Sequence, residues 1–271
     1  MIRIGPAGYP EGSRGPTDAI ARTAAMGFSA LELQFVRQAR MADDKALEAG
    51  KKAKELGVAL SAHAPYYINF NSRSSETVEK SHEWVMKSAR IAHRLGAEVI
   101  VVHAAAYAGR TAGESTSAVV AGVQRCRQAM EREGIDEVRL GLETMGKKGS
   151  WGTIQEIGQV MSQVDGVVPV VDFAHLHARA GGALRTKEDF LAVLAEVGAI
   201  HRGTLHCHYS CIEFTSAGEK RHLPLKEKQP DFKLLVSALK GRKADITIIS
   251  ETPHPQEGAA EMLSQLKRAR S

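Results

Sequence analysis

Short apolar runs recur along this chain at intervals of roughly 30 residues, and a segment with helical spacing of apolar residues follows each run. The run Val99–Val102 contains no polar residue, which is typical of a strand covered on both faces of a parallel sheet. The other predicted strands cover residues 2–5, 30–35, 58–62, 138–142, 167–171, 203–207 and 246–249. The predicted helices cover residues 19–26, 43–56, 77–95, 115–133, 154–164, 187–197, 232–239 and 258–268. This alternation predicts an α/β fold, a (β/α)₈ barrel whose helices surround a closed parallel sheet.

The length and composition are compatible with one such barrel. A (β/α)₈ barrel commonly occupies about 250 residues, so the 271 residues predict a single domain over residues 1–271. An open doubly wound sheet usually carries a glycine-rich phosphate loop after an early strand. The glycine-rich segment 5–12 lacks the GxGxxG pattern, and the chain contains no GxxxxGK[ST] motif. The closed barrel is therefore the preferred fold.

Three further properties narrow the class of protein. No apolar run approaches the roughly 18 residues that a membrane span requires, and the N-terminal residues lack a signal-peptide pattern, so we expect a cytoplasmic protein without a membrane partner. The three cysteines show no CxxC spacing, which predicts reduced thiols and no thiolate zinc site. The net charge of +5 suits a polyanionic partner, because Lys and Arg gain by displacing counterions from phosphates.

Side chains of the types that bind metals stand at the ends of six predicted strands. They are His63, His103, Glu143, Asp172, His208 and Glu251. His175 follows Asp172 by three residues, and His222 lies in the loop after the seventh strand. The carboxyl ends of barrel strands meet at one mouth, so these side chains are expected to face one cavity. Without cations the carboxylates would repel one another, and divalent metal ions remove this conflict.

The ligand types indicate the class of metal and the number of ions. Imidazole together with carboxylate suits Zn²⁺, Mn²⁺ or Fe²⁺, whereas sets of oxygen ligands suit Mg²⁺ or Ca²⁺. At about four ligands per zinc, the candidate set implies two or three ions. One histidine at a strand end is more often a hydrogen-bonded core residue than a ligand, and the convergence of several positions favours the cluster. The Glu32 side chain has two equally good interpretations, a place in the barrel cavity and a hydrogen bond to the barrel floor.

The motif HxPYxxN at residues 63–69 resembles the endonuclease IV family of apurinic/apyrimidinic endonucleases, within the xylose-isomerase-like TIM barrel superfamily. The resemblance spans nearly the whole chain and includes His103 and the segments 143–150, 171–175, 221–222 and 250–253. The segments 5–8 and 218–225 are similar to the archaeal-type branch. The resemblance implies a TIM barrel with three zinc ions that cuts double-stranded DNA on the 5′ side of abasic sites. It also implies a DNA-repair enzyme, which we expect to be a monomer.

The resemblance implies a role for each motif residue. It assigns His63 and His103 to the first ion and Glu143 to a bridge between the first and second ions, which makes Glu143 the predicted catalytic residue. It assigns Asp172, His208 and Glu251 to the second ion. It assigns His175 and His222 to the third ion. In this scheme the ions would activate the attacking water and neutralise charge on the departing oxygen, so no side-chain nucleophile would be required.

One segment departs from the family pattern Asp-Arg-His. The chain reads Glu219-Lys220-Arg221-His222, and an ammonium group at Lys220 cannot bind a metal. Either Glu219 replaces the aspartate through a shifted loop or the third site lacks that ligand, and Glu219 is preferred because two histidines alone under-ligate an ion. His206 and His208 face the same way on one strand, and His208 is preferred because it lies nearer the mouth.

The resemblance also implies DNA contacts and leaves a rival function. Tyr66 and Arg40 fall where the family inserts side chains into the duplex, although Tyr66 could simply pack over the site and Arg40 could cap a helix. Four further basic residues on mouth loops could contact phosphates: Arg37, Arg73, Lys147 and Lys148. The main rival is a xylose-isomerase-like sugar isomerase or epimerase with a Glu/Asp/His/Glu set and one or two ions. The additional histidines favour the hydrolase.

Overall fold

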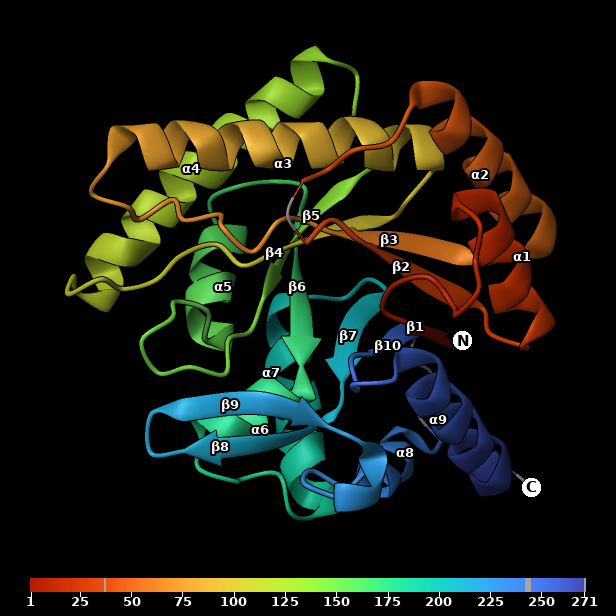
Figure 1. Ribbon diagram of the computed structural model, residues 1–271. Coiled ribbons are helices and arrows are strands. Elements are labelled where there is room, and N and C mark those ends of the chain that lie inside the picture. Colours follow the sequence, from red (N-terminus) through yellow and green to blue (C-terminus); the bar gives the residue numbers. More distant parts are fainter. Residues whose placement is uncertain (37, 242–244, 271) are drawn as a thin grey trace.

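The computed structural model describes residues 1–36, 38–241 and 245–270. Eight parallel strands form one sheet in the order β1-β10-β7-β6-β5-β4-β3-β2. They are β1 (Ile2–Pro6), β2 (Ala30–Gln34), β3 (Ala59–His63), β4 (Val99–Val102), β5 (Arg139–Glu143), β6 (Val167–Asp172), β7 (Leu205–Tyr209) and β10 (Ile246–Ser250). The sheet curves into a barrel with helices on its outer side (Figure 1). The predicted fold is confirmed, and each of the eight predicted strands is present.

The barrel closes between β1 and β2. The Ser29 amide donates to the Ile4 carbonyl oxygen at 3.0 Å, and the Gly8 amide donates to the Glu32 carbonyl oxygen at 2.8 Å. A Cβ atom on Gly5 would lie 1.8 Å from the carbonyl oxygen of Ala30. Closure therefore requires glycine at position 5, because any side chain there would separate the two strands.

Helices and glycine turns connect the strands. The helices are α1 (Pro16–Ala25), α2 (Asp43–Leu56), α3 (Ser75–Leu95), α4 (Ala112–Arg132), α5 (Ile154–Met161), α6 (Phe173–Arg179), α7 (Lys187–Ile200), α8 (Phe232–Leu239) and α9 (Pro255–Arg270). The predicted glycine stops are confirmed at Gly57 and Gly96, which end α2 and α3 in the left-handed conformation. Thr111 and Thr153 begin α4 and α5 with capping boxes. Among the described residues, no helix is both long and apolar enough to cross a membrane.

The interior of the barrel has an apolar lower layer. Val99, Val101 and Val170 pack together there, because alternate residues of β4 and β6 point inward. A Cβ atom on Gly141 would lie 2.6 Å from methyl groups of both Val99 and Val170. The absence of a side chain at Gly141 thus lets these valines meet, two residues below Glu143 on β5. The polar strand ends consequently stand on a packed floor.

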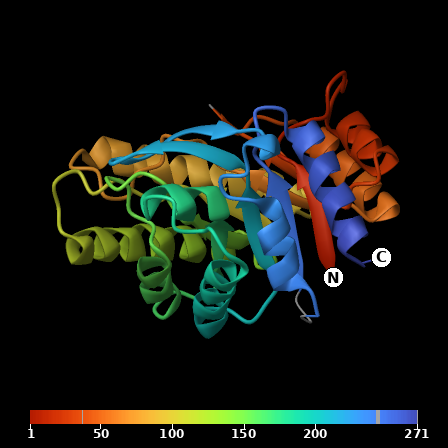
Figure 2. The same ribbon diagram turned by 90° about the horizontal axis from the view of Figure 1, so that it is seen from below.

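Two elements differ from the sequence prediction. The short helix α6 follows β6 directly, and Asp172 caps it by accepting a hydrogen bond from the His175 amide at 2.7 Å. A hairpin of β8 (Cys211–Thr215) and β9 (Gly218–Leu223) follows β7 and precedes the 3₁₀ turn Leu225–Glu227. Neither element was predicted, because α6 is too short to show a helical period and the hairpin is largely polar. The hairpin lies at the end of the barrel where the strands finish (Figure 2).

Candidate metal centre

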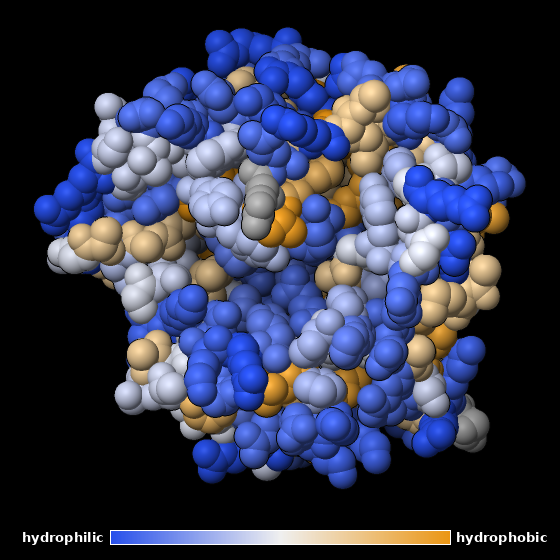
Figure 3. Space-filling view, in the orientation of Figure 1, coloured by the Kyte–Doolittle hydropathy of each residue, from blue (hydrophilic) through white to orange (hydrophobic). Residues whose placement is uncertain are grey.

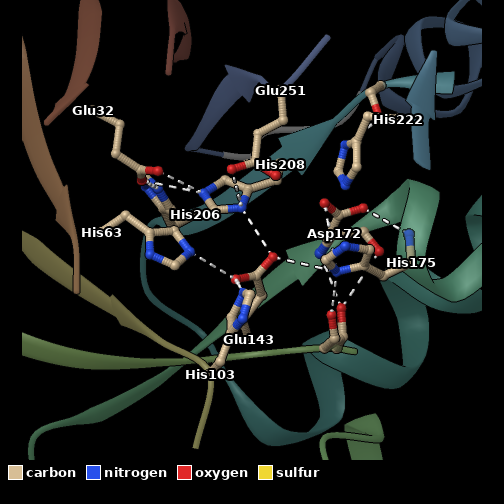
Figure 4. A network of polar contacts seen from close by, with 12 residues as sticks. Glu32, His63, His103, Glu143, Asp172, His175, His206, His208, His222 and Glu251 are labelled. Carbon is tan, nitrogen blue, oxygen red and sulfur yellow. Dashed lines mark hydrogen bonds and ion pairs between the residues drawn. The ribbon is translucent and has the colours of Figure 1, made fainter. Parts of the chain in front are cut away.

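Glu143 lies at the centre of the strand ends (Figure 4). It ends β5 and is only 1% exposed. Its Oε2 atom lies 2.7 Å from Nε2 of His103 and 3.3 Å from Nε2 of His63. Its Oε1 atom lies 3.1 Å from Nδ1 of His208 and 3.3 Å from Nδ1 of His175. The Glu143 carboxylate thus contacts four imidazoles from different parts of the chain. One of its oxygens faces His63 and His103, and the other faces His175 and His208.

Three overlapping groups of side chains surround this carboxylate. Within each group the ligand atoms lie within 4.8 Å of one another. The groups are His63/His103/Glu143, Glu143/Asp172/His208/Glu251 and Asp172/His175/His222. Glu143 is shared by the first two groups, and Asp172 is shared by the second and third. Eight of the nine predicted ligands therefore converge, and the ninth, Glu219, lies beside them.

The surroundings of the Asp172 carboxylate fit those of a metal ligand. Its Oδ1 atom accepts the hydrogen bond from the His175 amide, and its Oδ2 atom is buried without a hydrogen-bond partner in the described part of the chain. An unpaired carboxylate oxygen is costly to bury unless a cation is bound to it. This oxygen lies 3.7 Å from Nδ1 of His175, and with the neighbouring imidazoles it forms a donor set of the type that holds Zn²⁺ or Mn²⁺.

The electrostatics of the cluster depend on these contacts. Burial alone would raise the pKa of Glu143, but His103 and His208 hold that pKa well below its usual value. Burial alone would lower the pKa of His208 and His175. Neighbouring carboxylates nevertheless raise both pKa values well above normal. Glu251 raises the pKa of His208 the most, and Asp172 raises the pKa of His175 the most. The carboxylates therefore favour the protonated forms of His208 and His175.

The hairpin brings Glu219 and His222 to the edge of the cluster. Oε2 of Glu219 lies 3.6 Å from Nε2 of His175, and the His222 ring packs edge-on to His175 at 5.3 Å between centroids. Lys220 points away, because its Nζ atom pairs with Glu213 at 2.5 Å and its side chain is 56% exposed. The Glu219 carboxylate thus faces the cluster, whereas the Lys220 ammonium does not.

Glu32 and His206 form a second level, deeper in the barrel. Glu32 is fully buried, and its Oε2 atom lies 2.9 Å from Nε2 of His206 and 3.1 Å from Nε2 of His208. His206 does not join the groups that contain Glu143, whereas His208 does. The side chain of Glu32 thus projects into the barrel and also makes hydrogen bonds near the floor. Sequence reasoning missed Ser61, whose hydroxyl donates to Glu32 at 2.9 Å.

A cavity of about 550 Å³ opens above the cluster. Its lining includes His63, Tyr66, Lys147, Glu219 and Glu251. Figure 3 shows a hollow with hydrophilic residues at its base on this face of the molecule. Imidazole, carboxylate and ammonium groups in the lining can contact a charged substrate at the strand ends.

Tyr66 covers the histidines of the first group. Its ring lies 4.8 Å from the His63 ring and 5.2 Å from the His103 ring, and its side chain remains 44% exposed. Burial, followed by the nearby Glu251, raises the pKa of the Tyr66 phenol, so the hydroxyl stays neutral and donates to Gln34 at 3.3 Å. The Tyr66 ring therefore packs against His63 and His103 and still has an exposed part that a ligand in the cavity can contact.

Of the basic residues predicted to contact DNA, only some line the cavity in the described part of the chain. Lys147 lines the cavity, while Arg73 and Lys148 are exposed outside its lining. Arg40 is exposed between β2 and α2 and also lies outside the lining; the residue that caps α2 is Ala42. Arg37 lies outside the described residues. A DNA contact for Arg40 remains a prediction.

The fold and the strand-end cluster together define a TIM barrel with a candidate metal centre at its mouth. Residues 20–269 match the family described as xylose isomerase-like TIM barrel, and the chain belongs to that family. The uncharacterized protein MJ0133 of Methanocaldococcus jannaschii is 32% identical over 259 residues, which cover 93% of this chain and 92% of that protein. "Probable endonuclease 4" of Shouchella clausii is 29% identical over 195 residues, 66% of this chain and 63% of that protein. The superfamily predicted from the motifs is confirmed.

Solved structures with two different activities share this architecture. Endonuclease IV from Thermus thermophilus has a TM-score of 0.78 at 21% identity, and the match covers 99% of this chain and 98% of that chain. A D-tagatose 3-epimerase-like protein has a TM-score of 0.76 at 18% identity, with coverage of 99% and 97%. At these identities the two likenesses establish the fold alone. The choice between the activities must come from the site.

Proposed function

We propose that the protein is a metal-dependent endonuclease that cuts double-stranded DNA on the 5′ side of abasic sites. The observation that carries the proposal is the set of three overlapping ligand groups around Glu143 and Asp172. A single-ion centre needs about four ligands. This cluster adds His63, His103, His175 and His222, which a single-ion centre would not use. Such an excess suits the two or three ions of a phosphodiester hydrolase.

The proposed ligands follow from the groups. His63, His103 and Glu143 would hold the first ion, and Glu143 would also contribute to the second. Asp172, His208 and Glu251 would complete the second. His175, His222 and Glu219 would hold the third, with Asp172 near enough to share it. When bound, Zn²⁺, or Mn²⁺ in its place, would activate water and neutralise charge on the phosphate.

The residues of this chain contribute the remaining parts of the proposed mechanism. The cluster lies at the base of an open cavity, so it can accept a phosphate with its backbone attached. Lys147 at the lining supplies a positive charge for a neighbouring phosphate. The exposed Tyr66 ring can stack in the space of a missing base, and a nucleotide without a base is inexpensive to turn out of the duplex.

Binding of metal to the ion-free protein is expected to release protons, and the affinity is expected to fall as the pH falls. The raised pKa values of His175 and His208 favour the protonated rings, and an ion binds only the neutral ring, so it displaces their protons. Affinity should therefore rise with pH until both rings are neutral. Titration calorimetry of Zn²⁺ in two buffers with different ionisation enthalpies counts the protons. Equal heats in the two buffers would contradict this expectation.

Glu219→Ala is expected to lower the metal content by about one ion and to slow cleavage, whereas Lys220→Ala is expected to change neither. Glu219 is 16% exposed and faces His175, while Lys220 pairs with Glu213 on the outer surface of the hairpin. Metal analysis by mass spectrometry, combined with cleavage rates, separates the two variants. Similar losses in both would argue that the hairpin as a whole is required and that Glu219 is not a ligand.

The experiment that tests the function uses a duplex with one tetrahydrofuran abasic analogue and the zinc-loaded protein. We expect a single cut on the 5′ side, a 3′-hydroxyl that a DNA polymerase extends, and loss of cutting with a chelator. An intact duplex of the same sequence is the control. A metal-loaded protein that leaves the abasic duplex uncut would contradict the proposal.

The four-residue group Glu143/Asp172/His208/Glu251 supports a second candidate, a sugar isomerase or epimerase. This group has the Glu/Asp/His/Glu composition and needs one or two ions. The two candidates differ in their use of His63 and His103. If the His103→Asn variant still converts ketohexoses, the epimerase is favoured. If the same variant no longer cleaves abasic DNA, the endonuclease is favoured.

A further inference from the structure

Hydrogen bonds determine which ring nitrogen each histidine of the cluster offers. Nδ1 of His63 donates to the Ala64 carbonyl oxygen at 2.8 Å, and Nδ1 of His175 donates to the Thr144 carbonyl oxygen at 2.8 Å. Nδ1 of His222 lies 2.8 Å from the Ser210 hydroxyl. A neutral group thus engages Nδ1 in each of these three rings and leaves Nε2 for an ion, although Nδ1 of His175 also lies 3.3 Å from Oε1 of Glu143.

His208 has the opposite arrangement. Its Nδ1 atom faces the mouth, 3.1 Å from Oε1 of Glu143 and 3.5 Å from Oε1 of Glu251. Its Nε2 atom faces the barrel interior, 3.1 Å from the carboxylate of Glu32 (Figure 4). The second nitrogen of His208 thus meets the carboxylate of Glu32, which is fully buried and lies outside the three ligand groups around Glu143 and Asp172.

The Glu32 carboxylate is fixed from several sides. Ser61 on β3 donates to Oε2 at 2.9 Å, and the Gln34 amide donates to Oε1 at 2.9 Å. Nε2 of His206 lies 2.9 Å from Oε2. His206 is 4% exposed and lies two residues before His208 on β7. A carboxylate with this many donors has little freedom to turn, so it presents one acceptor direction to His208.

We propose that Glu32, held in place by His206, is a positioning residue that keeps His208 in the tautomer with hydrogen on Nε2 and leaves Nδ1 for the second ion. A carboxylate behind a metal-binding imidazole fixes the orientation of the ring and increases its basicity, and loss of such a partner typically weakens metal binding about 10- to 100-fold. The inference rests on the metal centre of the proposed function. It adds a second layer of residues beneath that centre.

A metal site formed by Glu32, His206 and His208 themselves is the competing interpretation, since their ligand atoms also lie within 4.8 Å of one another. It would require His208 to give both ring nitrogens to ions, and therefore to lose both of its ring protons. The positioning role requires only a neutral imidazole that donates from Nε2. It also agrees with the hydrogen bonds that Glu32 already receives.

The test compares Glu32→Gln and His206→Gln with the control Thr247→Val. Thr247 is buried on β10 opposite His206, and its hydroxyl has no hydrogen-bond partner in the described part of the chain. Competition with a chromophoric chelator measures zinc affinity, and ¹⁵N chemical shifts of the histidine rings report the tautomer. Thermal unfolding checks that each variant is folded, and His206→Gln still tests the inference if Glu32→Gln does not fold.

We expect Glu32→Gln to weaken the affinity for one zinc ion about 10- to 100-fold and to give His208 a mixture of tautomers. His206→Gln should have the same effects to a smaller extent, and Thr247→Val should have neither. Unchanged affinity and unchanged His208 shifts in both glutamine variants would overturn the inference, as would loss of one whole additional ion in His206→Gln. Neither measurement uses DNA, so failure here is distinct from failure to cut abasic duplexes.

Discussion

Glu143→Gln is expected to reduce cleavage of the abasic duplex by about 1,000-fold or more, the largest loss of any single substitution in the cluster. The amide keeps the volume of the side chain but removes the charge that both ions of the first two groups would share. It also replaces one acceptor oxygen by a donor NH₂ group, which repels cations. Glu143 is buried, and it is the one carboxylate that the first two ligand groups share.

Cleavage rates under single-turnover conditions and metal analysis provide the measurement for Glu143→Gln. The matched control is Glu213→Gln, which removes a surface ion pair with Lys220 and Arg221 on the outer side of the hairpin. The control should cleave normally, since pairs of this kind contribute little. Cleavage that persists in Glu143→Gln at near the normal rate would exclude Glu143 from the chemistry.

Asp172→Asn is expected to lower the metal content by up to two ions and to slow cleavage by at least about 100-fold. Asp172 belongs to two of the ligand groups, and its Oδ2 atom has no hydrogen-bond partner among the described residues. The asparagine side chain retains the oxygen that caps α6 through the His175 amide, so the helix should survive. The loss should therefore come from the ions rather than from the fold.

The control for Asp172→Asn is Asp189→Asn, a second substitution of the same kind near a helix start. Asp189 belongs to the capping box of α7 and is half-buried, away from the ligand groups. Metal analysis and circular dichroism should show full metal and a normal fold for the control. If Asp172→Asn binds as much zinc as the wild type, then Asp172 is a capping residue and the second and third groups do not share it.

The sequence was sufficient to predict the barrel and most of the cluster, because both are encoded locally. Apolar runs of fixed length predict the strands, and the residue that ends a run reaches the mouth by necessity. Glu143, Asp172 and His63 end their strands in the structure. Strand boundaries differ from the prediction by one or two residues, as at β5, which was predicted at 138–142 and is Arg139–Glu143.

Other parts of the site depend on contacts that no local pattern records. Glu32 and His208 are 176 residues apart in the chain, and they meet only because β2 and β7 face one another across the barrel. The pairing of β8 with β9 determines which way the Glu219 and Lys220 side chains point. These short strands show no clear period in the sequence, so the pairing was not predicted. The position of Arg40 outside the cavity depends on the path of a loop, which composition does not determine.

The side chains of the cluster come from two structural elements, the barrel and the hairpin of β8 and β9. Glu143, Asp172, His208 and Glu251 come from the ends of barrel strands or the residue that follows, whereas Glu219 and His222 come from a two-stranded sheet outside the barrel. Changes in the length or sequence of that hairpin can therefore add or remove an ion without altering the scaffold. The proposed third ion thus depends on an element outside the barrel, so the number of ions would be separable from the scaffold.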